Sequence, residues 1–308
     1  MTSSENTPAP EERLVARRRV PFWSFEGPWI WMLPAVILLL LYSVYPLLYN
    51  IMNSFREFDP LVRDFVWVGG ENWGKLFRDD RVLNALRVTF VYGVSALTIE
   101  LILGMSIALL LDAGVFLRGL WQTLLIMPMV IPPAVVGLMF RLLEHSEFGV
   151  ISWLLYSAGL LTPQEPLLGG TGKYALLGVL LADIWQWTPF CALIILAGLK
   201  SLPIEPLEAA EVDGASTWQR FWLVKLPLLR NVLAIVILFR IIDLYRIFDY
   251  IYIMTSGGPG QRTESISYYA YQTYTFIDWG YTATLGVIIL VLIWITTFLY
   301  TRVFHVEW

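Results

Sequence analysis

Six long apolar runs dominate this chain and restrict the folds that it can adopt. A helix needs about 20 apolar residues to cross a bilayer core of roughly 30 Å. Six segments meet that length, at residues 29–49, 88–111, 120–142, 174–199, 228–254 and 281–303. Backbone N–H and C=O groups in lipid must pair within their own segment, so such runs must be helical. The sequence therefore predicts an all-α, polytopic membrane protein with six transmembrane helices in one domain.

Composition agrees with this fold and excludes several functions. The 308 residues are 57% hydrophobic and only 15% charged, whereas about a quarter of the residues in a soluble domain are charged. The net charge of −4 is scattered along the chain, which gives no sign of nucleic-acid binding. Cys191 has no second cysteine to pair with, and His145 and His305 are too far apart for a histidine metal site. We therefore expect a transporter or scaffold in contact with membrane lipid, with no metal or other cofactor bound by this chain.

The termini carry the clearest orientation signal. Residues 1–28 form a polar tail, in which residues 1–10 have linker chemistry and are expected to be partly disordered. The tail is not a cleaved signal, because its charged part is long and no small-residue cleavage site follows the first apolar run. Lysine and arginine are nearly balanced between the two sides, but the arginine cluster at residues 17–19 favours an inside amino terminus. If the amino terminus is inside, six spans place both termini, including residues 304–308, in the cytoplasm.

A charged loop at residues 200–227 interrupts the apolar sequence. Pro203 and Pro206 follow the fourth run, and proline is tolerated in the first turn of a helix. A short helix is predicted at residues 205–213, followed by a turn at Gly214, where glycine can adopt positive φ. Ser216 and Gln219 have the spacing of a capping box, which predicts a second helix. The loop is therefore expected to be helix, glycine turn, helix, ending where Pro227 leads into the fifth run.

The same loop carries a longer signature. Glu-Ala-Ala is followed after three intervening residues by glycine, and then, after nine more intervening residues, by an aliphatic residue, one further residue and Leu-Pro. This pattern resembles the cytoplasmic coupling loop of binding-protein-dependent ABC importer permeases. The resemblance implies that the loop docks in a cleft of an ATP-binding subunit through Glu208, Ala209, Ala210, Asp213, Gly214, Leu226 and Pro227. An ordinary interfacial helical hairpin is the alternative. Arg230 and Asn231 stand where the family often has a proline, which leaves the start of the fifth span open.

Other motifs resemble the carbohydrate branch of these permeases, over roughly residues 29–303. They lie at residues 68–73 with 84–86, at Pro128, Pro132 and Pro133, at residues 183–190 and at residues 251–259. The resemblance implies a type I importer permease in the cell (inner) membrane that translocates a carbohydrate or polyol. It also implies four kinds of partner, namely a second homologous permease subunit, two ATP-binding subunits, an extracytoplasmic solute-binding protein and the substrate. ATP would be hydrolysed on the separate subunits, so this chain is not itself an enzyme.

Charged residues in the fifth run are the first candidates for a substrate pathway. Arg240, Asp243, Arg246 and Asp249 alternate in sign at three-residue steps, and such neighbours can pair along a helix. Charges within a span are costly and usually mark a pathway or an internal pair. Two interpretations stay open, a self-neutralised ladder that only packs and a cavity wall that binds hydroxyl groups.

The fourth run offers a second candidate face. Asp183, Gln186, Trp187 and Phe190 lie at offsets of 0, 3, 4 and 7, on one side of a helix. Aromatic rings beside polar groups suit a sugar, although the tryptophans could also be packing or interfacial anchors. The resemblance to maltose-type permeases implies a pathway formed by Asp183, Gln186, Trp187, Phe190, Arg240, Asp243, Leu244 and Ile247.

Three alternatives complete the analysis. A glycerol-3-phosphate-type permease would favour unpaired cations in the cavity, whereas the charges here are balanced. Glu100 lies in the middle of the second run, which would suit an ATPase-independent proton-coupled carrier or channel. An intramembrane enzyme is disfavoured because no nucleophile–base or metal constellation is present. The glycines before Lys173 faintly resemble a phosphate loop, but the required glycine and the Ser or Thr after the lysine are missing, so this is a glycine-rich outer loop.

Overall fold

The computed structural model describes residues 29–304. It divides into two compact units, Met1–Tyr49 and Asn50–Trp308. The tail predicted at residues 1–28 and the last four residues of the carboxyl-terminal tail lie outside the described part. The first unit contains α1 (Trp29–Leu39), a π-helical turn, η1 (Leu40–Val44), and the beginning of α2 (Tyr45–Asn53), which ends in the second unit. Residues Trp31–Asn53 have a mean hydropathy of 2.0 in their most apolar window, which agrees with a first span.

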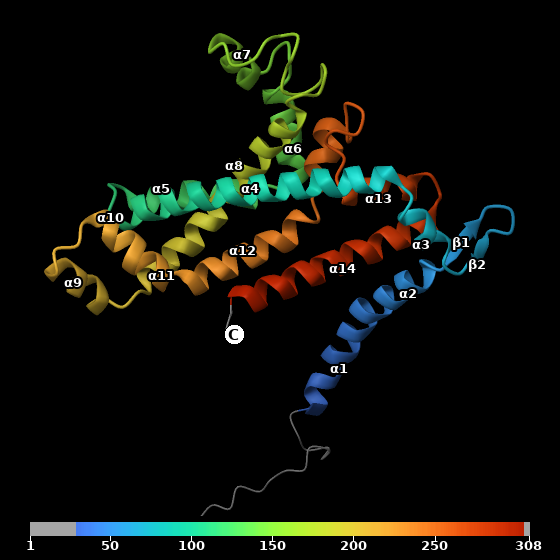
Figure 1. The fold of residues 1–308 in the computed structure, drawn as a ribbon, viewed down its shortest axis with the longest axis horizontal. Coiled ribbons are helices and arrows are strands. Elements are labelled where there is room, and N and C mark those ends of the chain that lie inside the picture. The colour runs from blue at the N-terminus through green and yellow to red at the C-terminus, as the bar shows by residue number, and fades with distance from the viewer. Residues whose placement is uncertain (1–28, 305–308) are drawn as a thin grey trace, which may run out of the picture. The chain divides into compact units, whose positions relative to one another are not determined.

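The second unit contains the remaining elements (Figure 1). A hairpin of β1 (Arg56–Asp59) and β2 (Asp64–Trp67) comes first, followed by α3 (Glu71–Leu76). The later helices are α4 (Asp80–Asp112), α5 (Arg118–Val130), α6 (Pro133–Leu143), α7 (Val150–Ser157), α8 (Ala175–Lys200), α9 (Glu205–Val212), α10 (Thr217–Arg220), α11 (Leu226–Leu228), α12 (Arg230–Leu244), α13 (Ile266–Thr275) and α14 (Trp279–Phe304). Two further π-helical turns are η2 (Phe221–Lys225) and η3 (Ile251–Thr255).

The hairpin is a departure from the predicted all-α fold. Its strands are antiparallel, with Arg56 opposite Trp67 and Asp59 opposite Asp64. The rings of Phe58 and Phe65 meet edge-on across it, 5.5 Å apart. Neither strand alternates strictly between apolar and polar residues, which is the pattern from which a half-buried strand is predicted. The rest of the described chain is helical, turn or loop, as expected.

Three predicted spans are continuous helices. α4, α8 and α14 contain most of the predicted runs at 88–111, 174–199 and 281–303, and each is long and apolar enough to cross a membrane. α4 starts earlier than predicted because Asp79 caps it, its carboxylate accepting the Arg81 N–H at 2.9 Å. The apolar pattern begins only after this polar first turn, so it could not reveal the start.

The third predicted span is broken. It divides into α5 and α6, whose axes differ by 97°, because Ile131 is extended before Pro132 and a residue before proline avoids the α region. A 66° bend also separates α10–α11 from α12, at the predicted transition from the charged loop to the fifth run. Within residues 29–304 four helices could therefore span a membrane, or up to six if each bent pair is one span. The expectation of six transmembrane helices is met only in part.

The fifth predicted run, residues 228–254, also ends early. α12 stops at Leu244 and the chain turns before η3 begins at Ile251. The hydroxyls of Ser265 and Ser267 donate hydrogen bonds to the carbonyls of Ile247 and Tyr245, both at 2.8 Å. These side chains replace the N–H donors that a continuing helix would supply.

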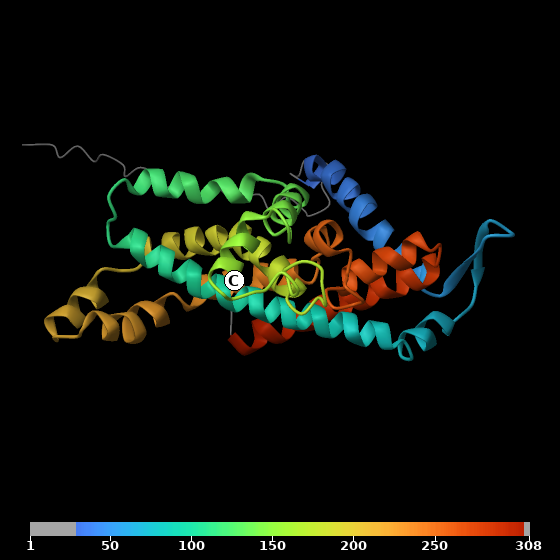
Figure 2. The same ribbon diagram turned by 90° about the horizontal axis from the view of Figure 1, so that it is seen from above.

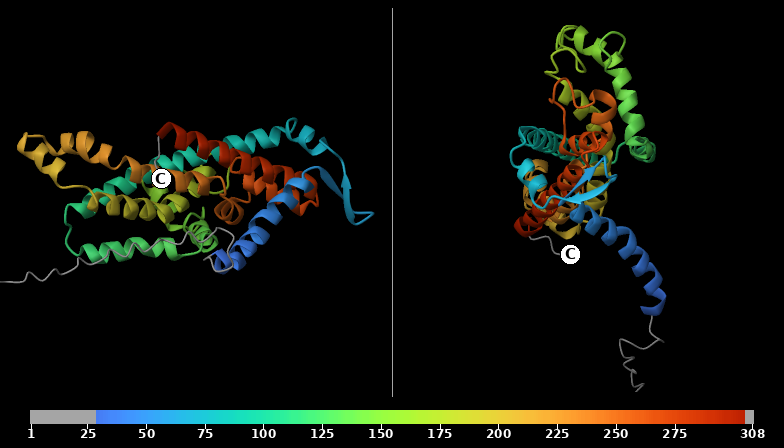
Figure 3. Two further views of the ribbon diagram at one scale, coloured as in Figure 1. Left: turned by 90° about the horizontal axis from the view of Figure 1, so that it is seen from below. Right: turned by 90° about the vertical axis from the view of Figure 1, so that its right-hand side faces the viewer.

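α8 is the central helix of the second unit. It lies between α4 and α5, as the views from above and below show (Figures 2 and 3). α4 approaches it closely at Gly104, where an added Cβ would come within 2.8 Å of the Cys191 Cβ; small residues permit such contacts between spans. The α9–α10 pair and the β-hairpin lie at opposite ends of this unit (Figure 1).

Candidate functional site

A buried ion cluster joins α4, α8 and α12. Arg240 is 1% exposed and donates to both carboxylate oxygens of Glu100, from Nε and Nη2, at 2.6 Å each. Nη2 also donates to Asp183 at 3.0 Å, and Nη1 donates to Asp243 at 2.7 Å. All three guanidinium nitrogens are therefore bonded to carboxylates, and the contact with Glu100 is bidentate, the strongest geometry for this pair.

The cluster is unbalanced in formal charge. One arginine faces three carboxylates, from Glu100, Asp183 and Asp243. A buried carboxylate without a partner is costly, so Arg240 is the group on which the others depend. The predicted charge ladder does not continue beyond it: Arg246 and Asp249 are exposed, and within the described chain neither side chain has an ion-pair partner.

A second chain of hydrogen bonds links the cluster to the α5–α6 break. Gln186 donates from Nε2 to the Ile131 carbonyl at 2.6 Å and accepts from the Tyr250 hydroxyl. That hydroxyl accepts the Trp187 indole N–H at 3.2 Å, and the Trp187 ring lies 5.4 Å from the Arg240 guanidinium carbon. The bend leaves the Ile131 carbonyl outside any helix, and Gln186 satisfies it. Its amide thus holds the broken span against α8.

The structure brings together most of the predicted pathway residues, in two different settings. Asp183, Gln186 and Arg240 are at most 3% exposed, while the Asp243 side chain is 48% exposed. Trp187 and Phe190 are half-buried with their rings 6.1 Å apart, edge to face. Leu244 and Ile247 belong to the main apolar core. Phe190 packs in a separate apolar cluster between α4, α8 and α12.

A small cavity opens at this place. Its volume is about 60 Å³, and it is lined by Pro133, Asp183, Trp187, Asp243, Leu244, Arg246, Ile247, Phe248, Asp249 and Tyr250. Ligand pockets are usually about 300–1,000 Å³, so this conformation does not enclose a sugar. The lining has three carboxylates and one guanidinium, with Arg240 and Glu100 directly behind it.

The polar loop has the predicted helix–turn–helix form. α9 begins at Glu205, and Gly214 adopts φ +72°, with no atom near the position of an added Cβ. Ser216 and Gln219 form the predicted capping box, with N–O distances of 2.8 and 3.3 Å. Arg220 ties the two helices together through Glu211 at 2.8 Å. The predicted coupling residues are exposed, except Ala210 and Leu226, which are partly buried.

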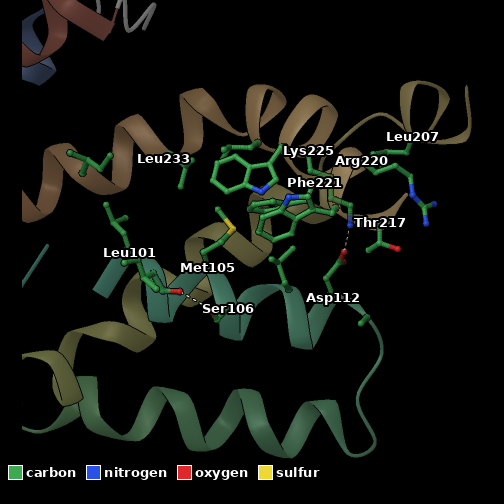
Figure 4. Close-up of a pocket in the computed structure, with 17 residues that line it drawn as sticks. Leu101, Met105, Ser106, Asp112, Leu207, Thr217, Arg220, Phe221, Lys225 and Leu233 are labelled. Atoms are coloured by element: carbon green, nitrogen blue, oxygen red, sulfur yellow. Dashed lines mark hydrogen bonds and ion pairs between the residues drawn. The ribbon is translucent and has the colours of Figure 1, made fainter. Parts of the chain in front are cut away.

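A groove of about 840 Å³ separates the end of α4 from the second helix of this loop (Figure 4). Asp112, the last residue of α4, pairs with Lys225 across it at 3.4 Å and with Lys200 of α8 at 2.8 Å. The sequence analysis did not identify this triad. The available signal was that Asp112, Lys200 and Lys225 each lie near an end of an apolar run. Which of these charges pair depends on how the helices pack, and the sequence does not show that.

On the side of the β-hairpin, polar contacts tie α4 to α13 and α14. Burial alone would raise the pKa of Asp79, but hydrogen bonds from the Tyr269 and Tyr281 hydroxyls and from the Arg81 N–H lower it below its ordinary value. Arg81 binds Glu264 in bidentate fashion at 2.8 and 2.6 Å. These contacts also went unpredicted, because more than 180 residues separate the partners in sequence.

Apolar helices long enough to cross a membrane, joined by buried ion pairs and accompanied by an exposed charged loop, define a polytopic membrane protein. A family model described as "Binding-protein-dependent transport system inner membrane component" matches residues 100–305. The chain belongs to this family of ABC transporter permeases.

Curated relatives and solved structures agree. The chain is 38% identical over 296 residues to the "Probable ABC transporter permease protein y4oQ" of Sinorhizobium fredii, covering 95% of this chain and 94% of that protein. It is 31% identical to the "Trehalose/maltose transport system permease protein MalF" of Thermococcus litoralis, covering 89% and 92%. A bacterial ABC transporter involved in the import of the acidic polysaccharide alginate contains a chain of the same fold, with a TM-score of 0.76, 20% identity and coverage of 90% and 94%.

Proposed function

We propose that this chain is the permease subunit of an ATP-driven ABC importer that moves a carbohydrate or polyol across the cytoplasmic membrane. The observation that carries this proposal is the exposed helix–turn–helix of α9 and α10, which lies in the segment whose sequence resembles the coupling signature. ATP is hydrolysed on two separate nucleotide-binding subunits, and this chain binds no cofactor of its own.

The surface of α9 suits a protein cleft. Glu208 and Ala209 are exposed, and Val212 is 87% exposed despite being apolar. Small side chains let a partner approach closely, the exposed valine offers apolar surface for burial, and the carboxylate can accept a hydrogen bond from a cation of the partner. The capping box and the Arg220–Glu211 pair make the element rigid, so that it can transmit a movement rather than absorb it.

The route from the loop to the pathway is short in sequence. α10, η2 and α11 lead directly into α12, which carries Arg240 and Asp243. A displacement of the loop by the ATP-binding subunits therefore moves the helix on which the ion cluster depends. Alternating access needs such a two-state element. A second, homologous permease chain completes the pathway, a solute-binding protein delivers substrate from outside, and both termini of this chain lie in the cytoplasm.

The charge of the pathway wall favours an uncharged solute. Glu100, Asp183, Asp243 and Asp249 stand against Arg240 and Arg246, which leaves a formal excess of two negative charges. A phosphorylated polyol would be repelled there. A glycerol-3-phosphate-type substrate remains the alternative, since the permease protein UgpA of the sn-glycerol-3-phosphate transport system of Agrobacterium fabrum is 28% identical over 268 residues.

A proton-coupled carrier is a weaker alternative. Both Glu100 oxygens are engaged by Arg240, whereas a proton-carrying carboxylate must be released in each cycle. Replacement of Glu100 by Gln distinguishes the two: a carrier would lose its proton dependence, and an importer would keep its dependence on ATP.

Co-purification with the ATP-binding subunit tests the proposal. The tagged chain is expressed with the ATPase encoded beside it, as wild type, as Glu208→Arg and as Glu71→Arg. Glu71 is an exposed acid at the other end of the second unit, so its variant carries the same change of charge away from the loop. We expect the ATPase with wild type and Glu71→Arg but not with Glu208→Arg. Equal recovery with all three would contradict the assignment of the loop.

A further inference from the structure

A second hollow, distinct from the pathway cavity, lies beside the first half of α4. Its volume is about 290 Å³, and it is lined by Asn84, Arg87, Val88, Val91, Gly172, Lys173, Leu176 and Arg262. The cations come from three separate elements, namely α4, the glycine-rich loop before α8 and the loop after η3. Among the residues that the structure describes, no carboxylate lines it. All three cationic side chains are exposed to solvent.

A close backbone contact and a hydrogen bond fix the loops around the hollow. Gly172 has φ +72°, and an added Cβ there would lie 2.6 Å from the Pro259 ring. Only glycine allows this approach, and it sets Lys173 beside the loop that carries Arg262. Asn84 fixes the same loop to α4 by donating to the Gln261 carbonyl at 2.9 Å. The glycine-rich segment that faintly resembled a phosphate loop therefore positions a cation.

The positive charge of the hollow is largely uncompensated. Over residues 29–304, neither Arg87 nor Arg262 has a carboxylate within ion-pairing distance. Glu264, which follows Arg262 closely in sequence, is 1% exposed and bound to Arg81. Lys173 lies 3.4 Å from Glu165, in an exposed contact of the kind that contributes little. Convergent cations in a concave surface concentrate the local field.

We infer that this hollow docks acidic side chains of the extracytoplasmic solute-binding protein. The inference rests on the proposed function, and it adds the place and the chemistry of the contact. A small anionic solute is the less suitable occupant, because such a solute would also have to pass the proposed pathway wall, which has an excess of negative charge. The carboxylates of a solute-binding protein stay outside the membrane, so they do not have to pass the negatively charged pathway wall. Exposed charges of this kind chiefly set association rate and salt dependence.

The test uses the complete importer in lipid nanodiscs, with the purified binding protein encoded beside it. ATPase activity is measured against binding-protein concentration for wild type, for Arg87→Glu/Arg262→Glu and for Arg63→Glu/Arg78→Glu. The last pair is exposed and lies near the β-hairpin, outside the hollow, so it matches the change of charge. For the hollow variant we expect an increase of about tenfold in half-saturating concentration at low salt, less than about twofold for the control, and unchanged basal activity. Added salt should raise the half-saturating concentration of binding protein for wild type and leave that of the hollow variant nearly constant.

The outcomes separate the two proposals. If the binding protein stimulates wild type and the hollow variant equally, the importer function stands and the docking site is wrong. If the binding protein does not stimulate wild type, both are wrong. If the variant alters the response only when an anionic solute is loaded, and not with a neutral one, the hollow serves the solute and the docking inference fails. Gel filtration confirms that each variant assembles.

Discussion

Arg240 and Glu100 form a bidentate ion pair with two N–O distances of 2.6 Å, although 140 residues separate them in sequence. The pair joins α12 to α4, and Asp183 adds α8 through the same guanidinium. Three helices that carry the predicted pathway residues are thereby held at one point. Because α12 follows the exposed loop in sequence, the proposed function would make this pair a link between the docking loop and the solute pathway.

Replacing Arg240 by Ala should destabilise the assembled transporter. Removing the one cation leaves buried carboxylates uncompensated, which typically costs about 3–5 kcal/mol. The thermal melting temperature of the purified complex should fall clearly. Arg246→Ala removes an exposed arginine six residues away and should change stability by less than about 0.5 kcal/mol. Equal melting temperatures for both variants would contradict the role assigned to Arg240.

Asp243→Asn should reduce transport without preventing assembly. The side chain is half exposed, lines the cavity and has one ion-pair contact, with Arg240. Loss of its charge weakens hydrogen bonding to a polar solute, and we expect uptake to fall by roughly tenfold, as for one charge-assisted hydrogen bond. Uptake of labelled solute into proteoliposomes measures this. Asp80→Asn, an exposed acid at the start of α4, serves as the control, and a matching loss there would show that the effect is not specific to the cavity.

Gln186→Met should loosen the bend between α5 and α6. The variant keeps the volume but loses the donor to the Ile131 carbonyl and the acceptor for Tyr250, and an unsatisfied buried group costs about 1–3 kcal/mol. Hydrogen–deuterium exchange of residues 128–136 should become faster. Gln122→Met on α5 changes a half-buried glutamine that has no side-chain hydrogen bond within the described residues. Unchanged exchange in Gln186→Met would mean that the prolines alone hold the bend.

Stability should fall with increasing pH because of Glu144, which follows directly after α6. The side chain is fully buried, and among the described residues neither carboxylate oxygen has a hydrogen-bond partner. Burial raises its pKa from 4.5 to about 8. The folded state therefore favours the protonated acid: the full stability is present below pH 4.5 and is lost progressively as pH rises through 8.

Melting temperatures measured between pH 5 and pH 9 test this pH dependence. Glu144→Gln should flatten the profile, because the amide is neutral throughout. Glu147→Gln, an exposed neighbour, should retain the wild-type slope. An unaltered slope in Glu144→Gln would assign the effect to another group.

Local sequence patterns were sufficient for most of the helices and for the charged loop. Runs of about 20 apolar residues required helices because lipid offers no other partner for the backbone. The spacing of Ser216 and Gln219 identified the capping box, and Gly214 identified the turn with positive φ, because a cap and a glycine turn involve only neighbouring residues. The family signature is contained in the same stretch and needed no tertiary information.

Pro132 acts locally at the break in the third run, but the groups that satisfy the freed carbonyls at both breaks are distant side chains. Ser265 and Ser267 donate hydrogen bonds to backbone carbonyls just after the end of α12. Gln186 donates a hydrogen bond to the Ile131 carbonyl at the α5–α6 bend. The apolar runs at 120–142 and 228–254 carry no sign of these donors. Local hydropathy therefore predicted longer, straighter helices than the tertiary hydrogen bonds allow.

The sequence by itself determined that this chain is a helical membrane protein with an exposed charged loop, because hydropathy and short-range spacing are local properties. Only the tertiary structure decided which charges are paired. Arg240 stood in an apparent ladder with Asp243, Arg246 and Asp249, yet its main partner is Glu100, and Arg246 and Asp249 remain exposed. The choice of partner for a buried charge depends on which helices pack together, and no pattern within one helix contains that information.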